Sequence, residues 1–264
     1  MIERKLGFTF GRTPEGREND YNALLKRLEQ QSAPVVPEVP INITPDDNPA
    51  QITPTNGWLY VPSIGMEFSP TLEGLGSNWY DAHKLARGKG FVMPSPVETW
   101  ALIFEAKANL SKPEFRKIYE FFTEKTLQNT WHSEWQDAHF IEKGNKMYMH
   151  RLKDFTKQNE PIFYTGVDIT GTYLAKDSYA NISQKTNITP EGLCKVGDSR
   201  NNYVKGENMY FWYPRDGTVA WFDAGSVWAD FDCDRYPSGS GSSLGVRYAR
   251  RVAPSVVGKK GGKK

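Results

Sequence analysis

Three aspartates at alternate positions near the C-terminus are the most prominent group of side chains that could do chemistry. Side chains alternate along an extended strand, so three such carboxylates would share one face, and carboxylate oxygens suit Ca²⁺. An EF-hand loop is excluded, because its sixth and twelfth positions would be Arg235 and Gly241. We favour a strand in which Phe231 and Cys233 face the core and the aspartates face outward. The three aspartates are Asp230, Asp232 and Asp234.

The cysteines and histidines show no catalytic or metal-binding spacing. Cys194 and Cys233 lack a C-x-x-C arrangement and are too few for a disulfide framework, although one bridge between them stays open. A small buried hydrophobic side chain explains Cys233 better than a nucleophile does. No H-E-x-x-H, G-x-S-x-G, P-loop or G-x-G-x-x-G motif occurs. We therefore expect no enzyme, no cofactor and no metal. The four histidines are His83, His132, His139 and His150.

The stretch 203–236 holds more aromatic rings than one small core needs. Strand alternation should send some of these rings outward, where Tyr and Trp contact proteins at low entropic cost or stack on sugars. The opposing interpretation, in which the rings fill a loop-rich core, is equally open. The candidate binding residues are Tyr210, Trp212, Tyr213, Trp221, Trp228 and Tyr236.

Local capping signals predict two of the helices that would support this stretch. The first helix begins at a cap supplied by Ser77 or Asn78 and ends at residues 88–90, where Gly-Lys-Gly stops it. The second begins at a capping box in which Ser95 caps the helix and Glu98 reaches back.

A third helix is predicted to begin after Ser111, with Pro113 just inside it, and to extend to about Leu127. Beyond Trp131 short apolar and aromatic runs typical of strands follow. These runs are 146–150, 162–164, 208–213, 219–222, 227–231 and 244–249, after an earlier one at 58–61.

Two further segments lie among these predicted strands. Asp216-Gly217 is a hairpin-turn signal between two of the runs. The residues around Trp135, between His132 and His139, are interpreted as a helix or a surface turn. Helices first and strands last favour an α+β fold with two or three helices and short antiparallel strands.

Three segments resemble one family. Residues 78–86 resemble the W-x-D-A helix of C-type-lectin-fold proteins related to the formylglycine-generating enzyme and to the C-terminal domain of collagen-like bacterial adhesins. Residues 90–98 are similar to the turn into that family's second helix, and residues 244–250 to its closing strand. Their order agrees with that fold over about residues 58–252.

The resemblance implies a C-type-lectin-like domain and structural roles for the matching residues. In the family the Trp and Ala pack the first helix on the sheet, and the Pro starts the second helix. The resemblance also implies a buried ionic contact between Glu98 and Arg247. Enzymatic members use a cysteine pair, but neither Cys194 nor Cys233 matches that motif. The matching residues are Trp79, Ala82, Pro94, Glu98, Gly245 and Arg247.

The two ends of the chain differ from its middle. Six prolines between positions 34 and 54 favour an extended arm, which carries a short amphipathic helix within residues 14–31. From Arg235 onward there are eight basic residues and no acidic one, within a net charge of +2. We divide the chain into an arm (1–57), a folded domain (58–252) and a flexible basic tail (253–264).

These features lead to an expectation of function. The sequence has no apolar run long enough for a membrane helix and no signal peptide at its N-terminus, so we expect no membrane insertion. Arm and domain together favour a non-enzymatic, oligomeric bacteriophage virion protein: a head fibre, a decoration protein or a tail-associated receptor-binding component. Residues 1–57 would contact other virion proteins, and the domain would attach to a host-surface glycan or protein.

Two alternatives come from other classes of protein. One is an oxidoreductase of the formylglycine-generating type, which would depend on Cys194 and Cys233. The other is an accessory protein that binds nucleic acid through the basic tail, although a solubilising tail is the favoured interpretation of these residues.

Overall fold

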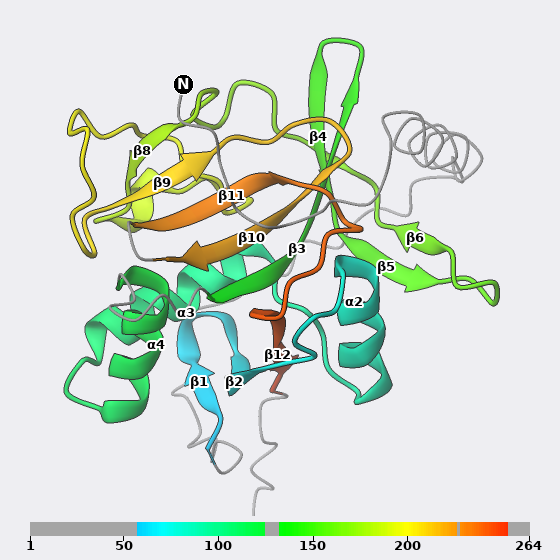
Figure 1. Ribbon diagram of the computed structural model, residues 1–264, viewed down its shortest axis with the longest axis horizontal. Helices are drawn as coiled ribbons and strands as arrows, with labels where there is room; N and C mark the ends of the chain where they lie inside the picture. Colours follow the sequence, from blue (N-terminus) through cyan, green and yellow to red (C-terminus); the bar gives the residue numbers. More distant parts are fainter. Residues whose placement is uncertain (1–56, 125–131, 226–227, 253–264) are drawn as a thin grey trace, which may run out of the picture. The chain divides into compact units, whose positions relative to one another are not determined.

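The computed structural model of the chain describes residues 57–124, 132–225 and 228–252. All described elements belong to one unit, which spans Asp47–Lys264. They form a ten-stranded sheet, a separate two-stranded sheet and three α-helices (Figure 1). The predicted arm with its helix, up to residue 56, and the predicted basic tail lie outside the described residues, and they stay predictions.

The large sheet has the strand order β1-β2-β12-β3-β10-β11-β9-β8, and β4 pairs with both β3 and β7. The strands β5 and β6 form a sheet of their own. Two short 3-10 helices, η1 and η2, complete the described elements. The bounds are β1 (Leu59–Val61), η1 (Pro62–Ile64), β2 (Met66–Glu73), β3 (His132–Lys143), β4 (Lys146–His150), β5 (Leu152–Phe155), β6 (Pro161–Phe163), β7 (Val167–Asp168), β8 (Ser178–Asn181), η2 (Lys185–Asn187), β9 (Asn208–Trp212), β10 (Thr218–Ala224), β11 (Ala229–Arg235) and β12 (Leu244–Arg251).

This β-rich architecture contradicts the predicted α+β, C-type-lectin-like fold. The prediction required short antiparallel strands, but the sheet is mixed: β9 runs parallel to β11, and β12 runs parallel to β3. It also gave too much weight to helices, whose caps are local signals, and omitted long strands such as β2 and β3. The fold class is therefore a large mixed sheet with three helices in the described residues.

The omission of β3 has a physical cause. The segment was interpreted as a helix or surface turn, yet it is a central strand that pairs with β10, β12 and β4. Two of its buried polar residues have partners in distant segments. Glu134 accepts from the Arg247 guanidinium at 2.9 Å, and Gln136 accepts from the Thr99 hydroxyl at 2.5 Å. Buried polar residues on a strand hide the apolar alternation that sequence patterns detect.

The predicted starts of the first two helices are confirmed. In α2 (Trp79–Gly88) the Asn78 side chain accepts a hydrogen bond from the backbone N–H of Asp81 at 3.0 Å. In α3 (Pro96–Ala108) the Glu98 carboxylate accepts from both the backbone N–H and the hydroxyl of Ser95, each at 2.8 Å. The sequence signals of these starts are local, so no distant partner was needed to recognise them.

The start of the third helix was wrong by one residue. In α4 (Pro113–Thr123) the N-cap is Lys112, not Ser111, and it makes no side-chain capping bond. The helix ends at Thr123, and Leu127 lies outside the described residues.

The turn at Asp216-Gly217 exists, but it does not close a hairpin. Gly217 has a φ of 70°, which favours glycine. The strands on either side, β9 and β10, are not neighbours, because β11 lies between them. The Asp216 carboxylate instead accepts a hydrogen bond from the backbone N–H of Glu142, at 2.8 Å. Long-range pairing therefore overrides the local hairpin signal.

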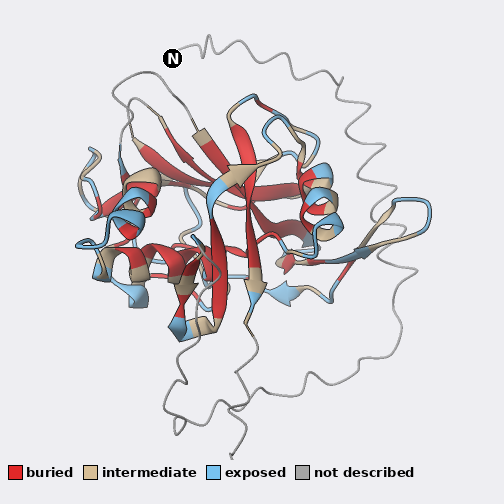
Figure 2. Ribbon diagram, turned by 90° about the horizontal axis from the view of Figure 1, so that it is seen from below, coloured by how far each residue is buried: buried red, intermediate tan, exposed pale blue. Residues whose placement is uncertain are grey.

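The helices cover different parts of the large sheet. Figure 1 shows α3 and α4 together on one side and α2 on the other, with β12 between them. The Trp100 ring of α3 packs against Phe222 and Phe231 at centroid distances of 5.1 and 6.1 Å. On the other side, Trp79 of α2 donates its indole N–H to the carbonyl of Gln136, at 2.8 Å. Figure 2 shows that most of the central strands are buried.

Candidate functional site

Alternation along β10 and β11 separates two sets of side chains. Phe222 and Phe231 stack on each other at 4.4 Å on the face that α3 covers. Their neighbours in sequence, Trp221, Asp230 and Asp232, therefore lie on the opposite face. Phe231 and Cys233 are buried in the core, as predicted. The prediction that the aspartates face solvent was wrong for Asp230 and Asp232, which are 7% and 0% exposed.

Four aromatic rings gather around Asp230, and we call this cluster the aromatic face. The indole N–H groups of Trp212 and Trp228 both donate to Asp230 Oδ2, at 3.1 and 3.3 Å. The Tyr210 ring lies 4.9 Å from Trp212 and 5.6 Å from Trp228, between centroids. Tyr179 of β8 meets Tyr210 edge-on at 5.1 Å. All four rings are half-buried, so each presents some surface to solvent.

The central carboxylate holds the rings in place. Burial, and the charge of Asp223 opposite it on β10, raise the pKa of Asp230 well above its usual range, while the two indole N–H groups act in the other direction. A single acceptor oxygen orients both indoles. The ring positions are therefore set by the sheet before any ligand arrives.

A second group of side chains lies on the same face of the sheet, and we call it the support. It consists of Trp135, Trp221, Asp232 and Arg235. Trp221 lies 5.2 Å from Trp135, and the Arg235 guanidinium lies 4.6 Å from the centre of the Trp221 ring. Arg235 also donates to Asp232 Oδ2 at 2.6 Å. Burial raises the pKa of Asp232, and the charge of Arg235 opposes this shift. Trp221 is only 6% exposed, so we assign it to the support and not to the accessible surface.

The remaining two predicted binding residues lie elsewhere. Tyr213 packs against the hydrophobic core, and the Arg215 guanidinium lies 5.1 Å from its ring centre. Tyr236 follows β11 and is 43% exposed. The structure therefore brings three of the six predicted residues, Tyr210, Trp212 and Trp228, into one cluster. Sequence reasoning missed Tyr179, because β8 has too short an apolar pattern to be recognised.

Within the described ranges, the cysteines do not pair and the acidic residues form no metal-binding group. Cys194 and Cys233 are both free and buried, so the bridge left open by the sequence is not formed. Burial raises the pKa of both thiols, which keeps them protonated. In the part of the chain that the structure describes, no group of three or more His, Cys, Asp or Glu residues is placed to hold a metal ion.

The residues that matched the family motifs have structural positions. Trp79 and Ala82 are fully buried where α2 packs on the sheet. Pro94 precedes α3, but the proline that occupies the first helical position is Pro96. At Gly245 an added Cβ would lie 2.7 Å from the backbone oxygen of Glu73, so strand β12 passes close to β2 there.

The ion pair implied between Glu98 and Arg247 is not formed. Arg247 Nε lies 2.9 Å from Glu134 Oε2, and Nη1 donates to the carbonyl of Ser69 at 2.7 Å. Glu98 instead pairs with Arg151, at 3.2 Å. The correct partner of Arg247 could not be found, because Glu134 lies in the strand that the sequence did not predict.

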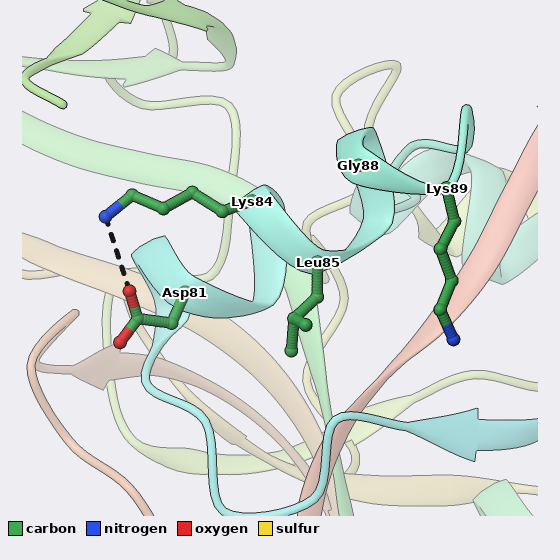
Figure 3. A pocket seen from close by; sticks show the side chains of 5 residues that line it. All are labelled: Asp81, Lys84, Leu85, Gly88 and Lys89. Atoms are coloured by element: carbon green, nitrogen blue, oxygen red, sulfur yellow. Dashed lines mark hydrogen bonds and ion pairs between the residues drawn. The ribbon is translucent and has the colours of Figure 1, made fainter.

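A depression of about 470 Å³ lies on the outer surface of α2 (Figure 3). Lys84 Nζ lies 3.4 Å from Asp81 Oδ1 there, and Leu85 is 40% exposed. None of the predicted site residues lines it, and we assign it no function. The lining residues are Asp81, Lys84, Leu85, Gly88 and Lys89.

Comparisons with known proteins give no family. No family model matches the sequence, and neither the curated proteins nor the solved structures contain a match. None of the helices in the described ranges is long and apolar enough to cross a membrane. Function must therefore be argued from the aromatic face itself.

Proposed function

We propose that this protein is a non-enzymatic binding protein that contacts a surface carbohydrate through the aromatic face. The observation that carries the proposal is the cluster of four half-buried rings around one buried carboxylate. Rings that are already held in place lose little conformational entropy on binding. Aromatic rings of this kind offer flat surfaces on which the C–H faces of sugars can stack.

The protonation state of the two cysteines favours a binding protein over an oxidoreductase. The oxidoreductase alternative needs a thiolate, since the thiolate is the reactive form of cysteine. Burial keeps Cys194 and Cys233 protonated, which disfavours that chemistry.

The setting that we propose is a virus particle, in which the protein is a structural or attachment component. Residues 1–57 would then join it to other particle proteins, and the aromatic face would contact the host surface. The proline-rich composition of the arm supports this division of roles.

The proposal is tested by screening the full chain against an array of bacterial surface glycans. We expect Trp212→Ala and Trp228→Ala each to weaken binding by about 30-fold or more, because a central aromatic contact is worth at least about 2 kcal/mol. Tyr164→Ala is the matched control, since Tyr164 is 55% exposed but lies outside the aromatic face. It should bind like the original protein.

Two results would count against the proposal. One is glycan binding that both tryptophan variants retain, which would move the site elsewhere. The other is a lack of glycan binding together with capture of a purified host surface protein that the tryptophan variants lose. In that case the face would bind protein.

A further inference from the structure

Three histidines outside the aromatic face are buried near one another. His139 of β3 and His150 of β4 are opposite each other in the antiparallel register, and both contact the ring of Phe163, at 5.1 and 6.2 Å. His83 of α2 contacts the Trp79 ring at 4.3 Å, and that ring also lies 6.1 Å from His139. The exposed fractions of His83, His139 and His150 are only 2%, 1% and 7%.

The surroundings of the two opposed histidines fit neutral imidazoles. His139 Nδ1 and His150 Nε2 are buried and have no hydrogen-bond partner. His150 Nδ1 lies 3.2 Å from the carbonyl of Tyr164, so the proton that it donates leaves Nε2 as a bare lone pair. A Cβ built at Gly166 would lie 2.5 Å from His150 Nε2, which shows how closely the backbone covers this nitrogen. A proton added there would lack an acceptor.

Burial accounts for the direction of the pKa shifts. Burial, together with the nearby His150, lowers the pKa of His139 to about 3. Burial and the charge of Lys143 lower the pKa of His150, and the Tyr164 carbonyl opposes this.

The β5–β6 hairpin lies over these imidazoles and is not part of the large sheet. The hairpin of β5 and β6 forms its own two-stranded sheet, so it can leave without breaking a ladder of the large sheet. Figure 1 shows it projecting beside α2. Its buried side chains are Leu152 and Phe163, which are 2% and 7% exposed. Polar anchors come from Arg87, which donates to the carbonyls of Leu152 and Lys153 at 3.0 and 2.8 Å, and from Asp137, whose Oδ1 accepts from the backbone N–H of Leu152 at 2.8 Å.

We propose that His139 and His150 form an acid-sensitive switch that holds the β5–β6 hairpin on the sheet only while both imidazoles are neutral. Protonation of either ring displaces Phe163 and residues 164–166, because the closed state offers the new N–H group no acceptor. The open state exposes the Trp79 and Phe163 rings. This inference is independent of the function proposed for the aromatic face.

Other titratable groups beside the switch also change the balance between the closed and open states. Asp137 Oδ1 lies 3.5 Å from His83 Nε2 but makes no hydrogen bond to it. Burial and the charges of Arg87 and Arg151 lower the pKa of His83, and we leave it out of the switch because it lies on α2 against the Trp79 ring. Burial raises the pKa of Asp137 to about 6, although Arg151 opposes the shift. A protonated Asp137 favours the closed state and therefore opposes the histidines.

The remaining neighbouring charges come from α2, β5 and the β3–β4 turn. Arg87 of α2 lies 3.7 Å from Asp154 of β5, and this pair is partly exposed. Lys143 precedes the turn and acts on His150 only through its charge.

Hydrogen exchange of the full chain at about pH 7 and pH 4.5 tests the switch, after correction for intrinsic exchange rates. A histidine whose pKa returns from about 3 to about 6.5 on opening favours the open state on the order of 100-fold at the lower pH, and Asp137 removes at most about 25-fold of this. We therefore expect the amides of residues 152–166 to open at least about threefold more at pH 4.5.

Variants separate the switch from general acid sensitivity. Asp137→Asn removes the opposing carboxyl, so the increase should approach about 100-fold. The double variant His139→Gln, His150→Gln should lose the increase and open less at pH 4.5, because Asp137 then acts alone. The control His132→Gln should respond like the original protein. An opening that does not depend on pH in both the original protein and Asp137→Asn would overturn the proposal, as would an unchanged response in the double variant.

A second measurement keeps the proposal testable if the double variant does not fold. NMR titration of the original protein reports the imidazole pKa values directly. Both His139 and His150 should titrate below about 6.5, the value of an exposed histidine. A pKa at or above that value for both residues would overturn the switch.

Discussion

At the scale of single residues, a buried ion pair determines which substitutions in the sheet cost the most stability. Arg247 and Glu134 are 1% and 0% exposed and form an ion pair at 2.9 Å. Removing one partner of such a pair leaves an uncompensated buried charge, so Arg247→Ala should lower the free energy of unfolding by about 3–5 kcal/mol. The exposed pair of Lys146 and Asp168 is the control, and Lys146→Ala should cost about 0–1 kcal/mol. Urea unfolding measures both variants, and equal losses would contradict the assignment.

The second prediction at this scale concerns Asp230, whose ionisation destabilises the folded protein. Because its folded-state pKa is raised, wild-type stability falls as the pH rises from about 4, where the unfolded carboxyl ionises first. Asp230→Asn cannot ionise, and its amide oxygen can still accept from Trp212 and Trp228. Thermal unfolding at several pH values should therefore show a smaller loss of stability toward neutral pH in the variant. An unchanged pH dependence would show that Asp230 ionises normally.

At the scale of elements, local signals could be predicted from the sequence and long-range pairing could not. Asn78 and the Ser95–Glu98 capping box mark helix starts through bonds made within three residues. Strand β3 was missed because Glu134 and Gln136 are buried by partners far away in the sequence. The aromatic face could be predicted only in part. Strand alternation placed Tyr210 and Trp212, but Tyr179 joins them through the β8–β9 pairing, which no local pattern reports.

The close passage of β12 and β2 supplies a prediction about an element. A Cβ at Gly245 would meet the backbone oxygen of Glu73 at 2.7 Å, and backbone cannot move aside as a flexible side chain can. Gly245→Ala should therefore destabilise the protein by about 1–3 kcal/mol. Gly197→Ala is the control, because its nearest contacts are the Leu174 methyl groups at 3.8 Å. Thermal shift measurements compare the two, and a Gly245→Ala variant as stable as the control would contradict the close approach.

At the scale of the whole molecule, the residues described between 57 and 252 contain a hydrophobic core formed by the sheet and helices. A chain of residues 58–264 should therefore stay folded. If residues 1–57 join the protein to other copies, the shortened chain should become monomeric while the full chain is oligomeric. Size-exclusion chromatography with light scattering compares the two. An unchanged oligomeric state, or unfolding of the shortened chain, would contradict the role of residues 1–57 in assembly.

The central claim is that ligand binds at the aromatic face, and indole NMR signals test it most directly. Each tryptophan gives one Nε1–H signal, and a bound carbohydrate should shift those of Trp212 and Trp228, whose indoles share Asp230. The signals of Trp79 and Trp100, both buried in the fold, should stay in place. Saturable shifts confined to Trp212 and Trp228 are the result that we predict. Binding that leaves these two signals unchanged would contradict the claim.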